Sequence, residues 1–155
     1  MRPTSDRVRE ALFSILGEIG GVAVLDLYCG TGALGIEALS RGAARATLVD
    51  TSTALARRNV AMLDLERRCE IVRSDAPRYL RRAHRRFDLI FCDPPYRLAD
   101  RLEAELDSLI PGRLAKGGRL ILESASRRPL ELGLPLVAER RYGDTLIRIY
   151  ARSNR

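Results

Sequence analysis

Apolar residues along the chain fall into two patterns. Short, almost unbroken apolar runs alternate with longer segments in which apolar residues return every three or four positions. Unbroken runs predict strands that are buried on both faces, which is the setting of a parallel sheet. These runs cover residues 22–27, 46–49, 70–74, 88–92 and 119–123.

The longer segments predict helices that alternate with the strands. The first helix is expected over residues 1–17, with its start at Arg2-Pro3-Thr4-Ser5-Asp6. A later one, over residues 53–66, should turn Ala56, Val60 and Leu63 toward the core. Two further helices are expected through residues 36–42 and 99–108.

The C-terminal quarter changes pattern. Residues 136–142 and 145–151 alternate or run apolar around Gly143-Asp144, which predicts a β-hairpin, and residues 116–118 predict a turn. We therefore expect an α/β fold with about seven strands, mostly parallel, with a C-terminal antiparallel hairpin and helices on both faces of the sheet. The 155 residues contain no visible linker or repeat, so residues 1–155 should form a single domain.

Composition indicates a globular protein. The hydrophobic fraction is 46%, and no apolar run approaches the roughly 18 residues of a membrane span. The N-terminus lacks the apolar core of a signal peptide, so we expect a cytoplasmic location and no membrane association. Cys29, Cys69 and Cys92 are widely spaced and the chain has one histidine, which favours reduced core cysteines and no metal site.

The net charge of +7 comes almost wholly from arginine. Such a charge attracts polyanions, although a run of arginines is more often a solvated helix face than a binding site. The densest run, Arg78 to Arg86, is compatible with either role.

A glycine motif, Gly30 to Gly35, follows the strand at 22–27. Asp26 lies four residues before the first glycine, and a carboxylate there would repel the pyrophosphate of a dinucleotide. It would suit a cationic or zwitterionic ligand. We expect a branched side chain at Gly32 to fill the space that such a ligand needs.

Four aspartates lie at or near the carboxyl ends of successive predicted strands, the edge at which open α/β sheets bind ligands. Asp50 stands 24 positions after Asp26. This is close to the position at which doubly wound folds place an acidic residue that binds ribose hydroxyls. The four are Asp26, Asp50, Asp75 and Asp93.

Asp93-Pro94-Pro95-Tyr96 ends the fourth strand. The two prolines remove backbone donors, so this turn offers mainly carboxylate and carbonyl acceptors. Asp93 and the Pro94 carbonyl could each accept a hydrogen bond from an NH2 group while the Tyr96 ring stacks on a flat base or amide. The residue types predict a planar amine as the substrate.

These motifs together resemble a class I S-adenosylmethionine-dependent methyltransferase with its Rossmann-like sheet. Residues 2–13, the stretch 26–43, Asn59 and the Asp93–Tyr96 turn resemble, more narrowly, the RsmD-type enzymes, which methylate the exocyclic N2 of a guanine in 16S ribosomal RNA. Members of that family usually carry a basic segment ahead of Arg2-Pro3-Thr4, which is absent here. Restoring such a segment is expected to raise RNA affinity and steepen its salt dependence.

The resemblance implies S-adenosyl-L-methionine as cofactor and 16S ribosomal RNA, or the assembling small ribosomal subunit, as partner, with no oligomer required. Asp93, Pro94 and Tyr96 would hold the target amine. The implied cofactor-binding residues are Asp26, Tyr28, Gly30, Gly32, Asp50, Thr51, Asp75, Ala76 and Asp93.

Four different functions also fit part of the sequence. A glutamine-N5 protein methyltransferase or a DNA adenine methyltransferase would use a similar acceptor turn, but the arginine-rich surface disfavours the first and the lack of a target-recognition domain disfavours the second. A NAD-dependent dehydrogenase would account for the glycines but not for Asp93 to Tyr96. A non-catalytic RNA-binding module would need the positive charge but not the four aspartates.

Overall fold

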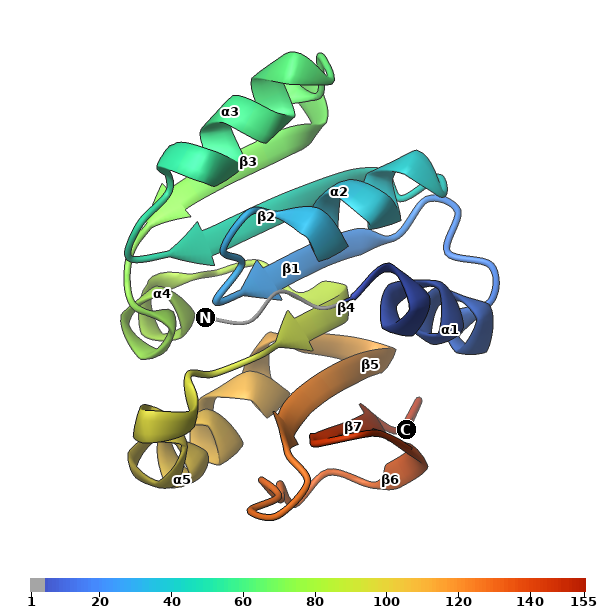
Figure 1. The fold of residues 1–155 in the computed structure, drawn as a ribbon, viewed down its shortest axis with the longest axis vertical. Helices are drawn as coiled ribbons and strands as arrows, with labels where there is room; N and C mark the ends of the chain where they lie inside the picture. The colour runs from blue at the N-terminus through green and yellow to red at the C-terminus, as the bar shows by residue number, and fades with distance from the viewer. Residues whose placement is uncertain (1–4) are drawn as a thin grey trace.

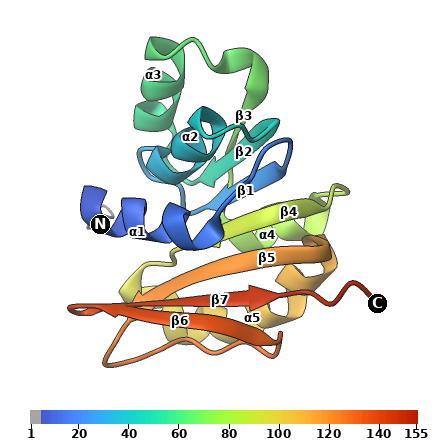
Figure 2. The ribbon, with the colours of Figure 1, turned by 90° about the vertical axis from the view of Figure 1, so that its right-hand side faces the viewer.

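A seven-stranded sheet forms the centre of the protein, in a computed structural model that describes residues 5–155. The strand order is β3-β2-β1-β4-β5-β7-β6, in which β7 is antiparallel to both neighbours and the other pairs are parallel. This confirms the predicted sheet with its C-terminal hairpin (Figures 1 and 2). The strands are β1 (Ala23–Leu27), β2 (Arg45–Asp50), β3 (Cys69–Arg73), β4 (Phe87–Cys92), β5 (Leu114–Ala125), β6 (Leu136–Tyr142) and β7 (Thr145–Ala151).

Within residues 5–155, five α-helices and three short 3-10 helices accompany the strands, with α1 ahead of β1 and the others between strands. The longest α-helices have 11 residues, and within residues 5–155 no helix is long and apolar enough to cross a membrane. The α-helices are α1 (Asp6–Leu16), α2 (Ala33–Ser40), α3 (Ala54–Met62), α4 (Ala76–Arg82) and α5 (Ala99–Leu109). The 3-10 helices are η1 (Glu66–Arg68), η2 (Tyr96–Leu98) and η3 (Ile110–Arg113).

The sheet has a hydrophobic core on each face, because successive residues of a strand point to opposite sides. Val24 packs with α1, α2 and α3 on one face, whereas its neighbour Leu25 packs with α4 and α5 on the other. All five residues of β1 are buried, as a central parallel strand requires. Figure 1 shows α1, α2 and α3 arrayed along one face.

Helix α1 begins one residue after its N-cap, Ser5, whose hydroxyl accepts from the Val8 N–H (3.3 Å). The predicted helix start at residues 2–4 lies outside the described residues. Phe13 is 1% exposed and lies with its ring centroid 5.7 Å from that of Phe91. This aromatic pair anchors α1 to β4.

Helix α3 ends earlier than the predicted 53–66. It stops at Met62, and Asp64 then adopts a left-handed φ of 55° that turns the chain toward η1. Leu63 is consequently 57% exposed, so its predicted burial was wrong, whereas Ala56 and Val60 are buried as expected. A local turn ends the helix there without any glycine or proline to mark it.

Strand β5 is longer than predicted. The expected turn at residues 116–118 lies within it, as an irregularity in which the pairing with β4 shifts register between Phe87 and Leu89. Gly117 provides the left-handed φ of 74° that this irregularity needs. Gly117 correctly indicated an unusual backbone conformation, but pairing with β4 on both sides of the irregularity keeps the segment in the sheet.

Candidate active site

The carboxyl ends of four parallel strands meet at one edge of the sheet. The register pairs Leu27 with both Val49 and Cys92, and Asp50 with Arg73. The loops after β1, β2, β3 and β4 therefore start at the same level. Strands β1 and β4 are neighbours in the sheet although β2 and β3 lie between them in the chain, which makes this the switch point where open α/β sheets bind ligands.

The loop after β1 bends sharply through left-handed residues. Tyr28, Gly30 and Gly32 have φ of 58°, 56° and 83°. A Cβ at Gly32 would lie 3.0 Å from the Leu48 Cδ1 atom and 3.6 Å from the Ala56 Cβ atom. A Cβ there would thus meet core side chains, and the expectation that a branched side chain would fill ligand space stays a prediction. Gly32 is required by backbone conformation and by packing.

Asp26 lies beneath this loop and is 3% exposed. Its Oδ2 atom accepts from the Gly35 N–H (3.0 Å), which ties β1 to the first turn of α2. Burial raises the pKa of Asp26 to about 8, against the opposing effect of the Gly35 hydrogen bond, and the nearby Asp50 raises it further. In the structure Asp26 positions the loop, and its predicted contact with a cofactor stays a prediction.

Asp50 and Asp75 organise the next two loops. The Asp50 Oδ2 atom accepts from the Gly30 N–H (2.8 Å) and its Oδ1 atom from the Ser52 N–H (3.1 Å). Asp75 caps α4, since its Oδ1 atom accepts from the Arg78 N–H (2.8 Å). Each carboxylate oxygen has more than one acceptor position, so both groups retain capacity to bind a ligand.

A pocket of about 350 Å³ opens at this edge, within the size range of small-molecule sites. Five of the nine predicted cofactor-binding residues line it: Tyr28, Asp50, Thr51, Asp75 and Ala76. The other four, Asp26, Gly30, Gly32 and Asp93, are not part of its lining. We name it the acidic pocket, because the carboxylates of Asp50, Asp75 and Glu105 contribute to its wall.

The Tyr28 hydroxyl is the one buried side-chain polar atom without a hydrogen-bond partner in the described part of the chain. Burial, together with nearby acidic groups, raises the pKa of Tyr28, so the group is a neutral donor. A buried hydroxyl without a partner costs about 1–3 kcal/mol.

Sequence reasoning missed part of the acidic pocket. Leu98 and Leu102 supply apolar wall, and Arg81 pairs with Glu105 across its rim between α4 and α5. Arg81 belongs to the arginine run that fitted either a solvated face or phosphate contact. No local pattern could reveal the pair, because its members lie 24 residues apart.

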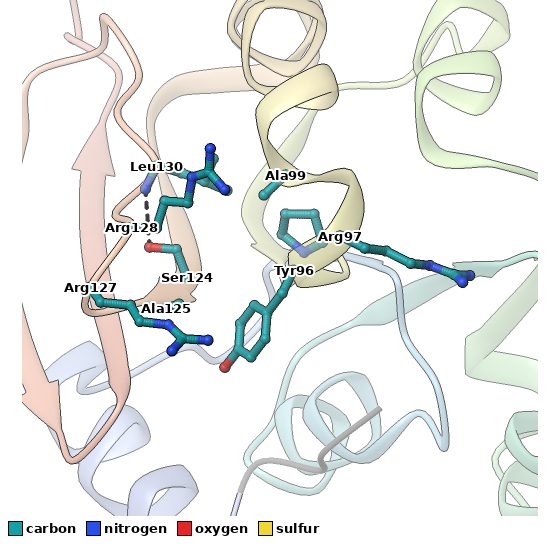
Figure 3. A pocket seen from close by; sticks show the side chains of 9 residues that line it. Tyr96, Arg97, Ala99, Ser124, Ala125, Arg127, Arg128 and Leu130 are labelled. Atoms are coloured by element: carbon teal, nitrogen blue, oxygen red, sulfur yellow. Dashed lines mark hydrogen bonds between the residues drawn. The ribbon is translucent and has the colours of Figure 1, made fainter.

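The acceptor turn, Asp93 to Tyr96, lies between the acidic pocket and a second cavity. Asp93 is half-buried, Pro94 is buried and Tyr96 is 51% exposed. The Pro95 carbonyl accepts from the Leu98 N–H (3.0 Å), which folds the chain into η2. Pro95 lines the acidic pocket, whereas Pro94 and Tyr96 line the second cavity, of about 400 Å³ (Figure 3).

This arrangement suits transfer of a group between two ligands. One ligand would occupy the acidic pocket, whose carboxylates favour positive charge and hydroxyl donors and oppose pyrophosphate. The other would lie in the second cavity against the exposed Tyr96 ring. The acceptor turn is the wall that both would touch.

Comparison with known proteins gives matches over nearly the whole chain. Residues 1–151 match the model of a family described as Conserved hypothetical protein 95. The chain is 37% identical over 164 residues to the Ribosomal RNA small subunit methyltransferase D of Escherichia coli (strain K12), with 98% of this chain and 80% of that protein covered.

Solved structures show the same architecture. A Streptococcus pyogenes protein described only as conserved hypothetical has a TM-score of 0.81 and 31% identity, with 94% of this chain and 96% of that chain covered. At 19% identity, the N-methyltransferase NodS of Bradyrhizobium japonicum WM9 shares the fold, with a TM-score of 0.73 and 96% of each chain covered.

Proposed function

The chain belongs to the RsmD family, described as Conserved hypothetical protein 95, and we propose that it transfers a methyl group from S-adenosyl-L-methionine to the exocyclic N2 of a guanine in 16S ribosomal RNA. The name of its Escherichia coli relative supports ribosomal RNA of the small subunit as substrate. The observation that carries the proposal is the position of the acceptor turn between the acidic pocket and the second cavity.

The residues of the acidic pocket fit this cofactor. Asp50 would accept from ribose hydroxyls, and Asp75 with Ala76 would meet the adenine between the apolar walls of Pro77 and Leu98. The bound cofactor supplies an electrophilic methyl group on a sulfonium, and the negative wall of the pocket favours that positive charge.

The acceptor turn would orient the amine. The N2 lone pair of guanine is delocalised into the ring, so the nitrogen is a weak nucleophile until hydrogen bonds to Asp93 and the Pro94 carbonyl fix its direction. The Asp93 carboxylate would also stabilise the positive charge that develops on nitrogen and then receive its proton, directly or through water. The Tyr96 ring, half exposed beside the cavity, would stack on the base. Alignment of this kind supplies up to roughly 7–11 kcal/mol of barrier reduction.

The remaining parts of the molecule are consistent with this role. The net charge of +7 favours an RNA partner. The two hydrophobic cores share one sheet, which supports a single methyltransferase domain over residues 1–155.

A transfer assay tests the proposal. The protein is incubated with radiolabelled S-adenosylmethionine and small-subunit ribosomal RNA from cells that lack the gene, and the product nucleosides are separated by mass. N2-methylguanosine is the expected product. Parallel incubations replace the RNA with DNA or with a protein substrate, and label in DNA adenine or in protein glutamine would favour the corresponding methyltransferase.

Calorimetry distinguishes a methyltransferase from a dehydrogenase and from a non-catalytic RNA-binding module. Binding of S-adenosylhomocysteine but not NADH is expected. Binding of NADH would favour a dehydrogenase, and RNA binding without cofactor binding would favour a non-catalytic module.

A further inference from the structure

We propose that the second cavity binds the target nucleotide of the RNA and that Arg127 holds a phosphate of that nucleotide. The inference rests on the proposed function and extends it, because it assigns the substrate's backbone contact to a residue outside the acceptor turn. The two spaces on either side of that turn differ in charge, and this difference is the starting observation.

The second cavity has a different charge from the acidic pocket. Among the residues that the structure describes, its lining contains three arginines and no carboxylate: Pro94, Tyr96, Arg97, Ala99, Ser124, Ala125, Arg127, Arg128 and Leu130. The acidic pocket has Asp50, Asp75 and Glu105 in its wall, together with Arg97 and with Arg81, which pairs with Glu105, so three carboxylates face two guanidinium groups there. A sulfonium is therefore favoured on one side of the acceptor turn and a phosphate on the other.

The three arginines differ in what they do. Arg128 reaches toward α5, where it pairs with Asp100 (2.5 Å), so its charge is already balanced. Figure 3 shows Arg97 directed away from the cavity and the Arg127 guanidinium directed toward the Tyr96 ring. Within residues 5–155, no carboxylate lies within ion-pair distance of Arg127. Arg127 is the arginine of this cavity that remains for a phosphate.

The segment that carries Arg127, residues 125–130, is held in place at both ends. The Arg128 N–H donates to the Ala125 carbonyl (3.0 Å), and the Leu130 N–H donates to the buried Ser124 hydroxyl (3.2 Å). The Leu130 carbonyl in turn accepts from Arg148 on β7 (2.9 Å). A guanidinium on a braced segment loses less freedom on binding than one on a loose loop.

The position of Arg127 matches the chemistry of a nucleotide. A base stacked on Tyr96 has its own phosphate one sugar away, and Arg127 lines the same cavity from the opposite wall. Its fork of N–H donors suits two phosphate oxygens. The Ser124 hydroxyl, which accepts from Leu130, can still donate to an oxygen on the ligand.

The test uses Arg127→Ala, with Arg127→Lys and Arg58→Ala as matched variants. Arg58 is an exposed arginine of α3, at the opposite end of the sheet, and its removal lowers the net charge equally. Methyl transfer to undermethylated small-subunit RNA gives kcat and KM, and filter binding of the same RNA at several salt concentrations gives the salt slope.

Arg127→Ala should raise KM for RNA about tenfold with little change in kcat, and lower the magnitude of the salt slope by roughly 0.7–1. Arg127→Lys should restore the slope, and Arg58→Ala should leave both unchanged. All variants should keep the parent's thermal midpoint. If the parent methylates the RNA while Arg127→Ala matches it in KM and slope, this inference is wrong and the proposed function stands. A parent that transfers no methyl group overturns both.

Discussion

The Asp26 carboxyl should make the stability of the protein depend on pH in a way that Asp26→Asn removes. Asp26 is 3% exposed and its pKa rises to about 8 because of burial. In the unfolded chain the group returns to its ordinary value of 3.8. Between these values the folded state keeps a proton that the unfolded state has lost.

The difference between the folded and unfolded pKa values of Asp26 sets the direction of the pH dependence. The contribution of Asp26 to stability is complete below about pH 4 and is lost as the pH rises through about 8. One proton changes the free energy of unfolding by at most about 1.4 kcal/mol per pH unit, so from pH 5 to pH 8 the loss is up to about 4 kcal/mol. This is a large share of the roughly 5–15 kcal/mol that is typical of domains.

Asparagine has nearly the same shape, does not titrate, and can accept from the Gly35 N–H through its amide oxygen. Urea unfolding at pH 5 and pH 8 should therefore show Asp26→Asn gaining stability relative to the parent as the pH rises, by up to about 4 kcal/mol. Asp64→Asn is the control, because Asp64 is exposed and asparagine tolerates its left-handed φ of 55°. If the free energy of unfolding changes between pH 5 and pH 8 by the same amount in Asp26→Asn and in the parent, within about 0.5 kcal/mol, the carboxyl is not buried as described.

Three further predictions test the site. Asp93→Asn should cut turnover on the order of a hundredfold and leave S-adenosylhomocysteine affinity unchanged in calorimetry; near-normal turnover would remove Asp93 from the mechanism. Gly35→Ala should lower the free energy of unfolding by about 1–3 kcal/mol, since its Cβ would lie 2.3 Å from the buried Leu48 side chain, whereas Gly20→Ala meets open space; equal urea midpoints would contradict this. Tyr28→Phe should raise stability by about 1 kcal/mol, and a lower thermal midpoint would count against an unpartnered hydroxyl.

The sheet was predictable because its central strands are buried on both faces. Residues 22–27 and 88–92 lack the polar alternation of a half-exposed strand, and they form the adjacent strands β1 and β4. The hairpin around Gly143 was equally visible from its turn residues. The end of α3 could not be predicted. It depends on the left-handed φ of Asp64, and an aspartate is not a residue that by itself indicates this conformation.

For the site, the chain order of strand ends predicted part of the group of residues that lines the acidic pocket. Tyr28, Asp50 and Asp75 line one pocket for this reason. The direction in which a side chain would point from Gly32 could not be predicted, because it depends on how closely α2 packs on β2. The positive cavity on the other side of the acceptor turn was missed too, because Arg127 and Tyr96 meet only after β5 pairs with β4.

Whether this protein methylates a guanine of 16S ribosomal RNA is decided by mass spectrometry of small-subunit RNA from cells with and without the gene. We expect one N2-methylguanosine of the parent RNA to be missing when the gene is deleted, and to return with the wild-type gene but not with Asp93→Asn. An identical set of N2-methylguanosines in both RNAs would contradict the proposed reaction.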